Sequence, residues 1–164
     1  MSAVGPPPGA GTVFRPNPPV TMDTPTAQVI VLDTNVVLDL LLFADPSTDV
    51  LRAELRSGQR RWIATDAMRA ELQRVLDYPA IARALTAHGV QATQLLTRFD
   101  TACQLQPEGP ACPVRCSDRD DQPFIDLAVA HRALLLSKDK AVLRLRRRLV
   151  PLGVSVQSVF TPAA

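Results

Sequence analysis

The chain has 164 residues and a formal net charge of +2, with 46% hydrophobic and 21% charged residues. These values are typical of a single globular domain with a substantial core, and the near-neutral charge alone does not indicate a nucleic-acid-binding protein. The longest apolar stretch, residues 36–43, is interrupted by Asp39 and is far shorter than a membrane span, so we expect no membrane partner.

The first 27 residues differ in composition from the rest of the chain. Residues 1–27 contain seven of the fifteen prolines, together with Gly, Ser and Thr. They have neither the basic start nor the apolar centre of a signal peptide. We therefore expect a disordered, partly polyproline tail, followed by a folded domain over residues 28–160.

Three cysteines are too few and too irregularly spaced for a disulfide framework. Cys112 and Cys116 are separated by three residues, and no second Cys or His pair accompanies them, so a zinc site is not expected. We interpret Cys103, Cys112 and Cys116 as reduced thiols of a cytoplasmic protein.

The folded part begins with a short apolar run that ends on an acid. Residues 28–32 (QVIVL) predict a buried parallel strand, and Asp33 follows directly. The next residues, Thr34 and Asn35, can also cap the helix expected over residues 36–43.

Three more helical regions and a strand are expected before residue 106. Asp45 and Pro46 predict the start of a helix that stops at Gly58. Residues 62–64 predict a strand, and Thr65 can cap a helix whose apolar stripe is followed by a stop at Tyr78–Pro79. Residues 80–105 predict two helices divided near 88–89, with enough apolar surface to suggest a homodimer interface.

The last third of the chain continues the same alternation. A Pro-containing loop over residues 106–115, with a short strand possible at its end, precedes a helix from about Pro123. A strand over residues 134–136, a basic helix from Lys140 and a strand over residues 154–156 follow. The alternation predicts an α/β fold with a mainly parallel, two-faced sheet.

Two acids follow apolar strands. Asp33 and Asp139 are each suited to be helix N-caps, but two independent junctions of this kind are hard to explain by capping alone. The carboxyl ends of parallel strands meet at one edge of a sheet, so we expect both acids to lie there. A cluster of like charges at that edge predicts a divalent cation with oxygen ligands.

Two more acids are candidates for the same site. Glu71 lies at the border of an apolar helix face, so it either pairs with a base such as Arg74 or belongs to a site. Asp121 falls on the inward side of the helix that begins near Pro123. Asp126 points about 140° away from Asp121 by helical arithmetic, and we expect it to be exposed.

Other residues are candidates for supporting roles. Asn35 can orient the Asp33 carboxylate or a water, and Ser137 can hold the Asp139 carboxylate or a phosphate oxygen. Asp118 and Asp120 can add negative field or a water-mediated contact. Basic side chains nearby are candidates for attracting a phosphate backbone. They are Arg119, Lys138, Lys140 and the arginines of residues 144–148.

Four segments of the chain resemble those of PIN-domain ribonucleases, and in particular the toxin components of toxin–antitoxin systems related to VapC-type toxins. The segments are VLDTN at 31–35, ELQRVLDYP at 71–79, DRDDQPFIDLA at 118–128 and LLSKD at 135–139. The resemblance implies a PIN-like three-layer sandwich with a five-stranded, mainly parallel sheet. It also implies that four acids, Asp33, Glu71, Asp121 and Asp139, share one groove.

The resemblance further implies an activity and a set of partners. These are one or two Mg²⁺ or Mn²⁺ ions, endonucleolytic cleavage of single-stranded RNA, and a cognate antitoxin. Two alternatives remain. One is a non-catalytic nucleic-acid or protein-binding module in which the acids are caps. The other is a DNA-directed nuclease of the 5′-nuclease type, disfavoured because the chain lacks the extra acids and clamp regions of those enzymes.

Overall fold

The computed structural model describes residues 28–161, and the tail predicted over residues 1–27 lies outside this range. Its centre is a five-stranded sheet with the strand order β3-β2-β1-β4-β5, in which every neighbouring pair is parallel. The strands are β1 (Gln28–Leu32), β2 (Arg60–Ala64), β3 (Gln104–Leu105), β4 (Leu134–Leu136) and β5 (Ser155–Gln157).

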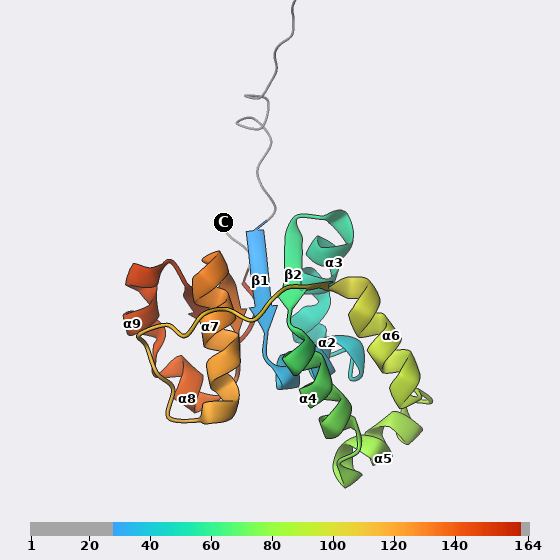
Figure 1. The fold of residues 1–164 in the computed structure, drawn as a ribbon. Helices are drawn as coiled ribbons and strands as arrows, with labels where there is room; N and C mark the ends of the chain where they lie inside the picture. The colour runs from blue at the N-terminus through green and yellow to red at the C-terminus, as the bar shows by residue number, and fades with distance from the viewer. Residues whose placement is uncertain (1–27, 162–164) are drawn as a thin grey trace, which may run out of the picture.

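The helices cover both faces of the sheet, as Figure 1 shows. One face carries α2 (Thr34–Leu41), α3 (Asp49–Ser57), α4 (Asp66–Leu76), α5 (Pro79–Ala87) and α6 (Ala92–Ala102). The other carries α7 (Gln122–His131), α8 (Lys140–Leu143) and α9 (Arg146–Leu149). Short 3₁₀ turns occur at η2 (Pro46–Thr48), η3 (Arg119–Asp121) and η4 (Val150–Leu152). The predicted α/β three-layer sandwich is confirmed.

This arrangement follows from right-handed crossovers. The chain moves from β1 to β2 to β3 in one direction across the sheet, which places the intervening helices on one face. It then returns through the long connector over residues 106–118 and continues through β4 to β5 in the opposite direction, so α7 to α9 lie on the other face (Figure 1).

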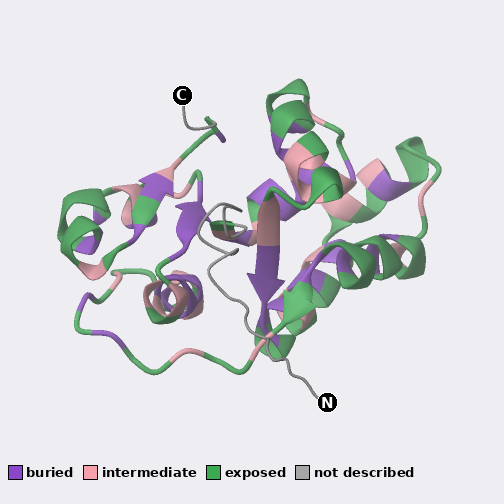
Figure 2. Ribbon diagram, turned by 90° about the horizontal axis from the view of Figure 1, so that it is seen from above, coloured by how far each residue is buried: buried purple, intermediate pink, exposed green. Residues whose placement is uncertain are grey.

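The core is continuous across the sheet. The last three residues of β1 and of β2 and all of β4 are buried, and Figure 2 shows buried residues on the strands and on the helix sides that face them. Trp62 of β2 packs edge-on against Phe99 of α6, with ring centroids 5.2 Å apart. This packing fixes the position of the strand ends at which the candidate site lies.

Most helix starts and stops were predicted from local sequence signals. Thr65 caps α4 by accepting a hydrogen bond from the Met68 N–H at 3.2 Å, and α3 ends at Gly58 with a φ of 85°. The two helices expected between residues 80 and 105 are present as α5 and α6. Asp45 and Pro46 open the 3₁₀ turn η2 rather than a full helix, and α3 begins after it.

Two local predictions differ from the structure. The strand considered possible at the end of the 106–115 loop is not formed; the short edge strand β3 comes just before the loop. The basic helix is divided into α8 and α9. Leu145 and Leu149 are buried while the arginines between them are exposed.

Within residues 28–161, none of the helices has both the length and the apolar content required to cross a membrane.

Candidate active site

The acids predicted from the sequence gather at the carboxyl edge of the sheet. Asp33 directly follows β1, and Asp139 lies just beyond the end of the neighbouring strand β4. A pocket of about 290 Å³ opens at this edge. Six acids line it, which are Asp33, Glu71, Asp118, Asp120, Asp121 and Asp139.

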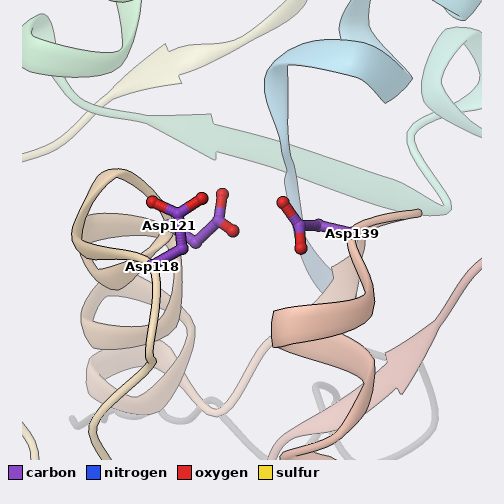
Figure 3. Close-up of side chains that lie close together, drawn as sticks. All are labelled: Asp118, Asp121 and Asp139. Atoms are coloured by element: carbon purple, nitrogen blue, oxygen red, sulfur yellow. The ribbon is translucent and has the colours of Figure 1, made fainter.

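Three of these acids form a tight group. Carboxylate oxygens of Asp118, Asp121 and Asp139 all lie within 4.8 Å of one another. Asp118 and Asp121 come from the η3 turn before α7, and Asp139 comes from the start of α8; Figure 3 shows the three side chains facing a common space. Asp33 and Glu71 line the same pocket outside this closest group.

Asp33 is held rigidly at the floor of the site. It is buried, one carboxylate oxygen accepts the Val36 N–H at 3.1 Å, and the other accepts the Ser137 hydroxyl. Burial raises the pKa of Asp33 above its ordinary value, the two hydrogen bonds oppose that shift, and the charge of Asp139 adds to it. Asp33 is therefore both the N-cap of α2 and an acid of the pocket.

Glu71 reaches the pocket from α4. Its carboxylate accepts the Thr34 hydroxyl at 3.1 Å, so the first residue of α2 orients it. Burial is the main cause that raises the pKa of Glu71, and the charges of Asp120 and Asp33 add to it. The Thr34 hydrogen bond and the charge of Arg74 oppose that shift. Within residues 28–161 Glu71 forms no ion pair with Arg74, so the paired-base interpretation is not supported.

Asp121 has one buried carboxylate oxygen, Oδ2, that lacks a hydrogen-bond donor among the described residues. The pKa of Asp121 is raised from 3.8 to about 8, first by burial and then by Asp139, with which a protonated Asp121 can share a hydrogen bond. A buried carboxylate oxygen without a donor is costly unless a proton or a cation neutralises it.

The donor set of the pocket fits a hard divalent cation. Its polar lining consists of carboxylates together with Thr34 and Asn35, and no Cys or His of residues 28–161 is part of it. Oxygen ligands of this kind are preferred by Mg²⁺ and Mn²⁺, whereas zinc sites use thiolate and imidazole. The residues present therefore fit the metal that the sequence predicted.

A hydrogen-bonded clasp fixes the turn that carries Asp118 and Asp121. Asp126 accepts the Cys112 N–H at 3.1 Å and the Gln122 side-chain amide at 2.9 Å. The Gln122 amide also donates to the Val114 carbonyl at 3.0 Å, and its oxygen accepts the Cys116 N–H at 2.6 Å. These bonds tie residues 112–116 to the first turns of α7.

The prediction that Asp126 is exposed was wrong. Its side chain is only 14% exposed, because the 106–118 connector folds back over that side of α7. Gly109 makes this close approach possible, since a Cβ there would lie 2.5 Å from the Asp126 carbonyl oxygen. The connector has no periodic pattern, so its contact with α7 could not be read from the sequence.

Of the residues predicted to support the site, Asn35 and Asp118 are part of the pocket lining, and Ser137 has a different partner from the one expected. Ser137 donates to Asp33 instead of holding the Asp139 carboxylate, although its oxygen accepts the Asp139 N–H at 3.1 Å. Asp120, considered together with Asp118 for a supporting contact, also lines the pocket. The sequence reasoning missed the lining residues Thr34 and Tyr78.

The three basic residues predicted to bind RNA are exposed, but they do not line the acidic pocket. Lys138 forms an ion pair with Asp39, and Arg119 lines a smaller neighbouring pocket with Gln122. Within residues 28–161 the Lys140 side chain forms no ion pair.

A parallel sheet with acids gathered at its carboxyl edge defines an α/β protein with a candidate site for a divalent cation. A family model described as PIN domain matches residues 29–141, which is more than half of the chain. The chain therefore belongs to the PIN domain family and has its nuclease-type fold. PIN domains are generally nucleases and usually use divalent metals. Among proteins with curated descriptions, none matches this chain.

Proposed function

We propose that this protein is a metal-dependent endoribonuclease that cleaves single-stranded RNA. The observation that carries the proposal is the close group of Asp118, Asp121 and Asp139, in which one buried Asp121 oxygen has no donor. Asp33 and Glu71 line the same pocket, each fixed by a hydroxyl from another segment. These five acids would hold one or two Mg²⁺ or Mn²⁺ ions.

The chemistry is hydrolysis of a phosphodiester. A water oxygen forms a bond to phosphorus, the bond from phosphorus to the leaving oxygen breaks, and the water proton passes to an acceptor. A bound divalent cation lowers the pKa of water and offsets negative charge that develops on the phosphate. The chain's own contribution is a set of carboxylates whose positions are fixed before substrate arrives.

The hydroxyl groups of Thr34 and Ser137 have a positioning role in this proposal. Ser137 holds the Asp33 carboxylate and Thr34 holds that of Glu71, so neither acid must reorganise during the reaction. Preorganised groups of this type account for much of the catalytic effect in enzymes that stabilise developing charge.

Basic side chains at the rim would offset repulsion between RNA and the acidic pocket. Arg119 and Lys140 are exposed and take part in no ion pair recorded for residues 28–161, whereas Lys138 is held by Asp39. Each phosphate contact made by such a side chain makes the slope of log K against log salt concentration more negative by about 0.7 for a single strand.

The test is cleavage of a single-stranded RNA in Mg²⁺ or Mn²⁺, with single-stranded and duplex DNA beside it. We expect cleavage of the RNA that EDTA abolishes and that Asp121→Asn reduces by orders of magnitude. Asp66→Asn is the matched control, because Asp66 is an exposed acid of α4 outside the pocket. Cleavage that persists in EDTA and in Asp121→Asn would refute the proposal.

We further propose that the protein is the toxin component of a toxin–antitoxin pair. The support is the resemblance of its four acid-bearing segments to such toxins, together with its membership of the PIN domain family. Expression of the wild type should arrest growth, Asp121→Asn should not, and a small protein encoded beside the gene should relieve the arrest. Equal growth with the wild type and Asp121→Asn would contradict this role.

A further inference from the structure

The acidic pocket is also lined by apolar side chains that the metal chemistry does not use. Its lining includes Leu38 and Phe124, which are buried, and Val75 and Ile81, which are partly exposed. Tyr78 lies at its edge with 56% of its surface exposed. Of the large apolar side chains that are exposed within residues 28–161, Tyr78 is the one that lines this pocket.

We propose that Tyr78 is a stacking platform for a nucleobase of the strand whose phosphate lies at the acids. This inference rests on the proposed function and specifies how the same site would recognise its substrate. A phosphate at the acids leaves the attached or adjacent base close to Tyr78, because the acids and Tyr78 line one pocket of about 290 Å³. Aromatic side chains bind unstacked bases in this way with little dependence on sequence.

The backbone of Tyr78 is fixed, although its ring is exposed. The Tyr78 N–H donates to the Val75 carbonyl at 3.0 Å, and the Tyr78 carbonyl accepts the Ala82 N–H at 2.8 Å. Pro79 follows and begins α5, so the residue is held at a rigid junction between α4 and α5. A residue at such a junction loses little backbone conformational entropy when a base stacks on its ring.

The stacking subsite explains why a single strand would be the substrate. In a duplex, both faces of each base are covered by neighbouring pairs, so a base must leave the stack before it can contact Tyr78. Bases of a single strand are exposed without that cost. Binding should therefore be stronger for single-stranded than for duplex nucleic acid, with modest dependence on the identity of the base.

The test measures affinity for a fluorescein-labelled single-stranded RNA in Mg²⁺ by anisotropy, with Asp33→Asn in every protein to suppress cleavage. Adding Tyr78→Ala should raise Kd about 5- to 150-fold, which corresponds to one lost base–aromatic stack. Adding Tyr78→Phe should leave Kd close to that of the parent, because the ring is kept. Phe43→Ala is the control, since Phe43 is another exposed aromatic residue outside the pocket.

An abasic scan makes the test specific to stacking. At the position whose base occupies the subsite, removing the base should weaken binding to the parent protein, and Tyr78→Ala should cause no additional loss there. If Tyr78→Ala does not fold, Tyr78→Leu serves instead, because it retains apolar volume without a ring.

Two results would overturn the subsite alone: unchanged Kd in Tyr78→Ala, or equal effects of Tyr78→Ala on every abasic strand. A change in self-association without a change in RNA affinity would assign Tyr78 to a protein interface and would also overturn it. If the parent does not bind single-stranded nucleic acid and the wild type does not cleave it, both the subsite and the proposed function fail.

Discussion

Ser137, at the end of β4, donates its hydroxyl hydrogen bond to Asp33, at the end of β1. The two residues are 104 positions apart in sequence, and both are buried. The Ser137 oxygen also accepts the Asp139 N–H, so one side chain joins the two acids that follow the central strands. Adjacent parallel strands thus position the floor of the site through a single hydroxyl group.

The Ser137–Asp33 bond predicts a specific loss in Ser137→Ala. Removing the donor leaves a buried carboxylate with one fewer hydrogen bond, which costs about 1–3 kcal/mol of unfolding free energy. The pKa of Asp33, already raised by burial, should rise further. Mg²⁺ affinity at neutral pH should fall about 10- to 100-fold, as is typical when a group that orients a ligand is lost.

Urea unfolding and a Mn²⁺ titration measure these two effects. Ser158→Ala is the matched control, since Ser158 is exposed and lies outside the acidic pocket. If Ser137→Ala and Ser158→Ala retain equal metal affinity, the Ser137 hydroxyl does not position Asp33.

The metal-free protein should become less stable as pH rises, because the pKa of Asp121 is raised in the folded state. Its pKa is 3.8 as an ordinary side chain and about 8 in the folded protein, so the folded state holds a proton that the unfolded state releases. The free energy of unfolding therefore falls as pH rises from about 4 to about 8. Asp33 and Glu71 contribute in the same direction, because the pKa of each is raised.

Thermal unfolding in EDTA across this pH range tests the prediction. Asp121→Asn should flatten the pH dependence, since the amide cannot titrate, whereas Asp66→Asn should retain it. Mg²⁺ should stabilise the wild type most at pH 8, because a cation favours the charged carboxylates. A wild-type stability that rises with pH in EDTA would contradict the assigned environment of Asp121.

The clasp formed by Gln122 and Asp126 predicts a local effect on the connector. Gln122→Ala removes the acceptor of the Cys116 N–H and the donors to Val114 and Asp126. The amides of Cys112 and Cys116 should then exchange faster with solvent, and Mn²⁺ affinity should fall because Asp118 and Asp121 follow the same segment. Hydrogen exchange and a Mn²⁺ titration measure the two changes.

The control for the clasp is Gln73→Ala, since Gln73 is an exposed residue of α4 away from the connector. It should change neither amide exchange at Cys112 and Cys116 nor metal affinity. Unaltered exchange at both amides in Gln122→Ala would show that the connector does not depend on the clasp.

The positions of Asp33 and Asp139 could be predicted because they depend on one rule. Each acid follows a short, buried, β-branched or leucine-rich run, and the carboxyl ends of adjacent parallel strands must meet. Glu71 could be suggested as a site residue from its place beside an apolar helix face. Its partner Thr34 could not, because that contact spans 37 positions and depends on how α2 and α4 pack.

The contacts of the 106–118 connector could not be predicted from the sequence. Asp126 was expected to be exposed because helical periodicity describes a helix surface but not a loop that folds over it. The pairing of Lys138 with Asp39 is also a tertiary contact between separate elements. Periodicity and strand-end rules therefore predicted which elements carry the acids of the site. The hydrogen-bond partners of those acids could be identified only from the three-dimensional structure.

A Mn²⁺ titration followed by electron paramagnetic resonance measures directly whether the acids of the pocket bind a divalent cation. These acids include Asp33, Glu71, Asp118, Asp121 and Asp139. We expect saturable binding of one or two ions by the wild type. Asp121→Asn should weaken that binding by more than about tenfold, and Asp66→Asn should leave it unchanged. No saturable binding by the wild type, or equal binding by the wild type and Asp121→Asn, would show that these acids do not form a metal site.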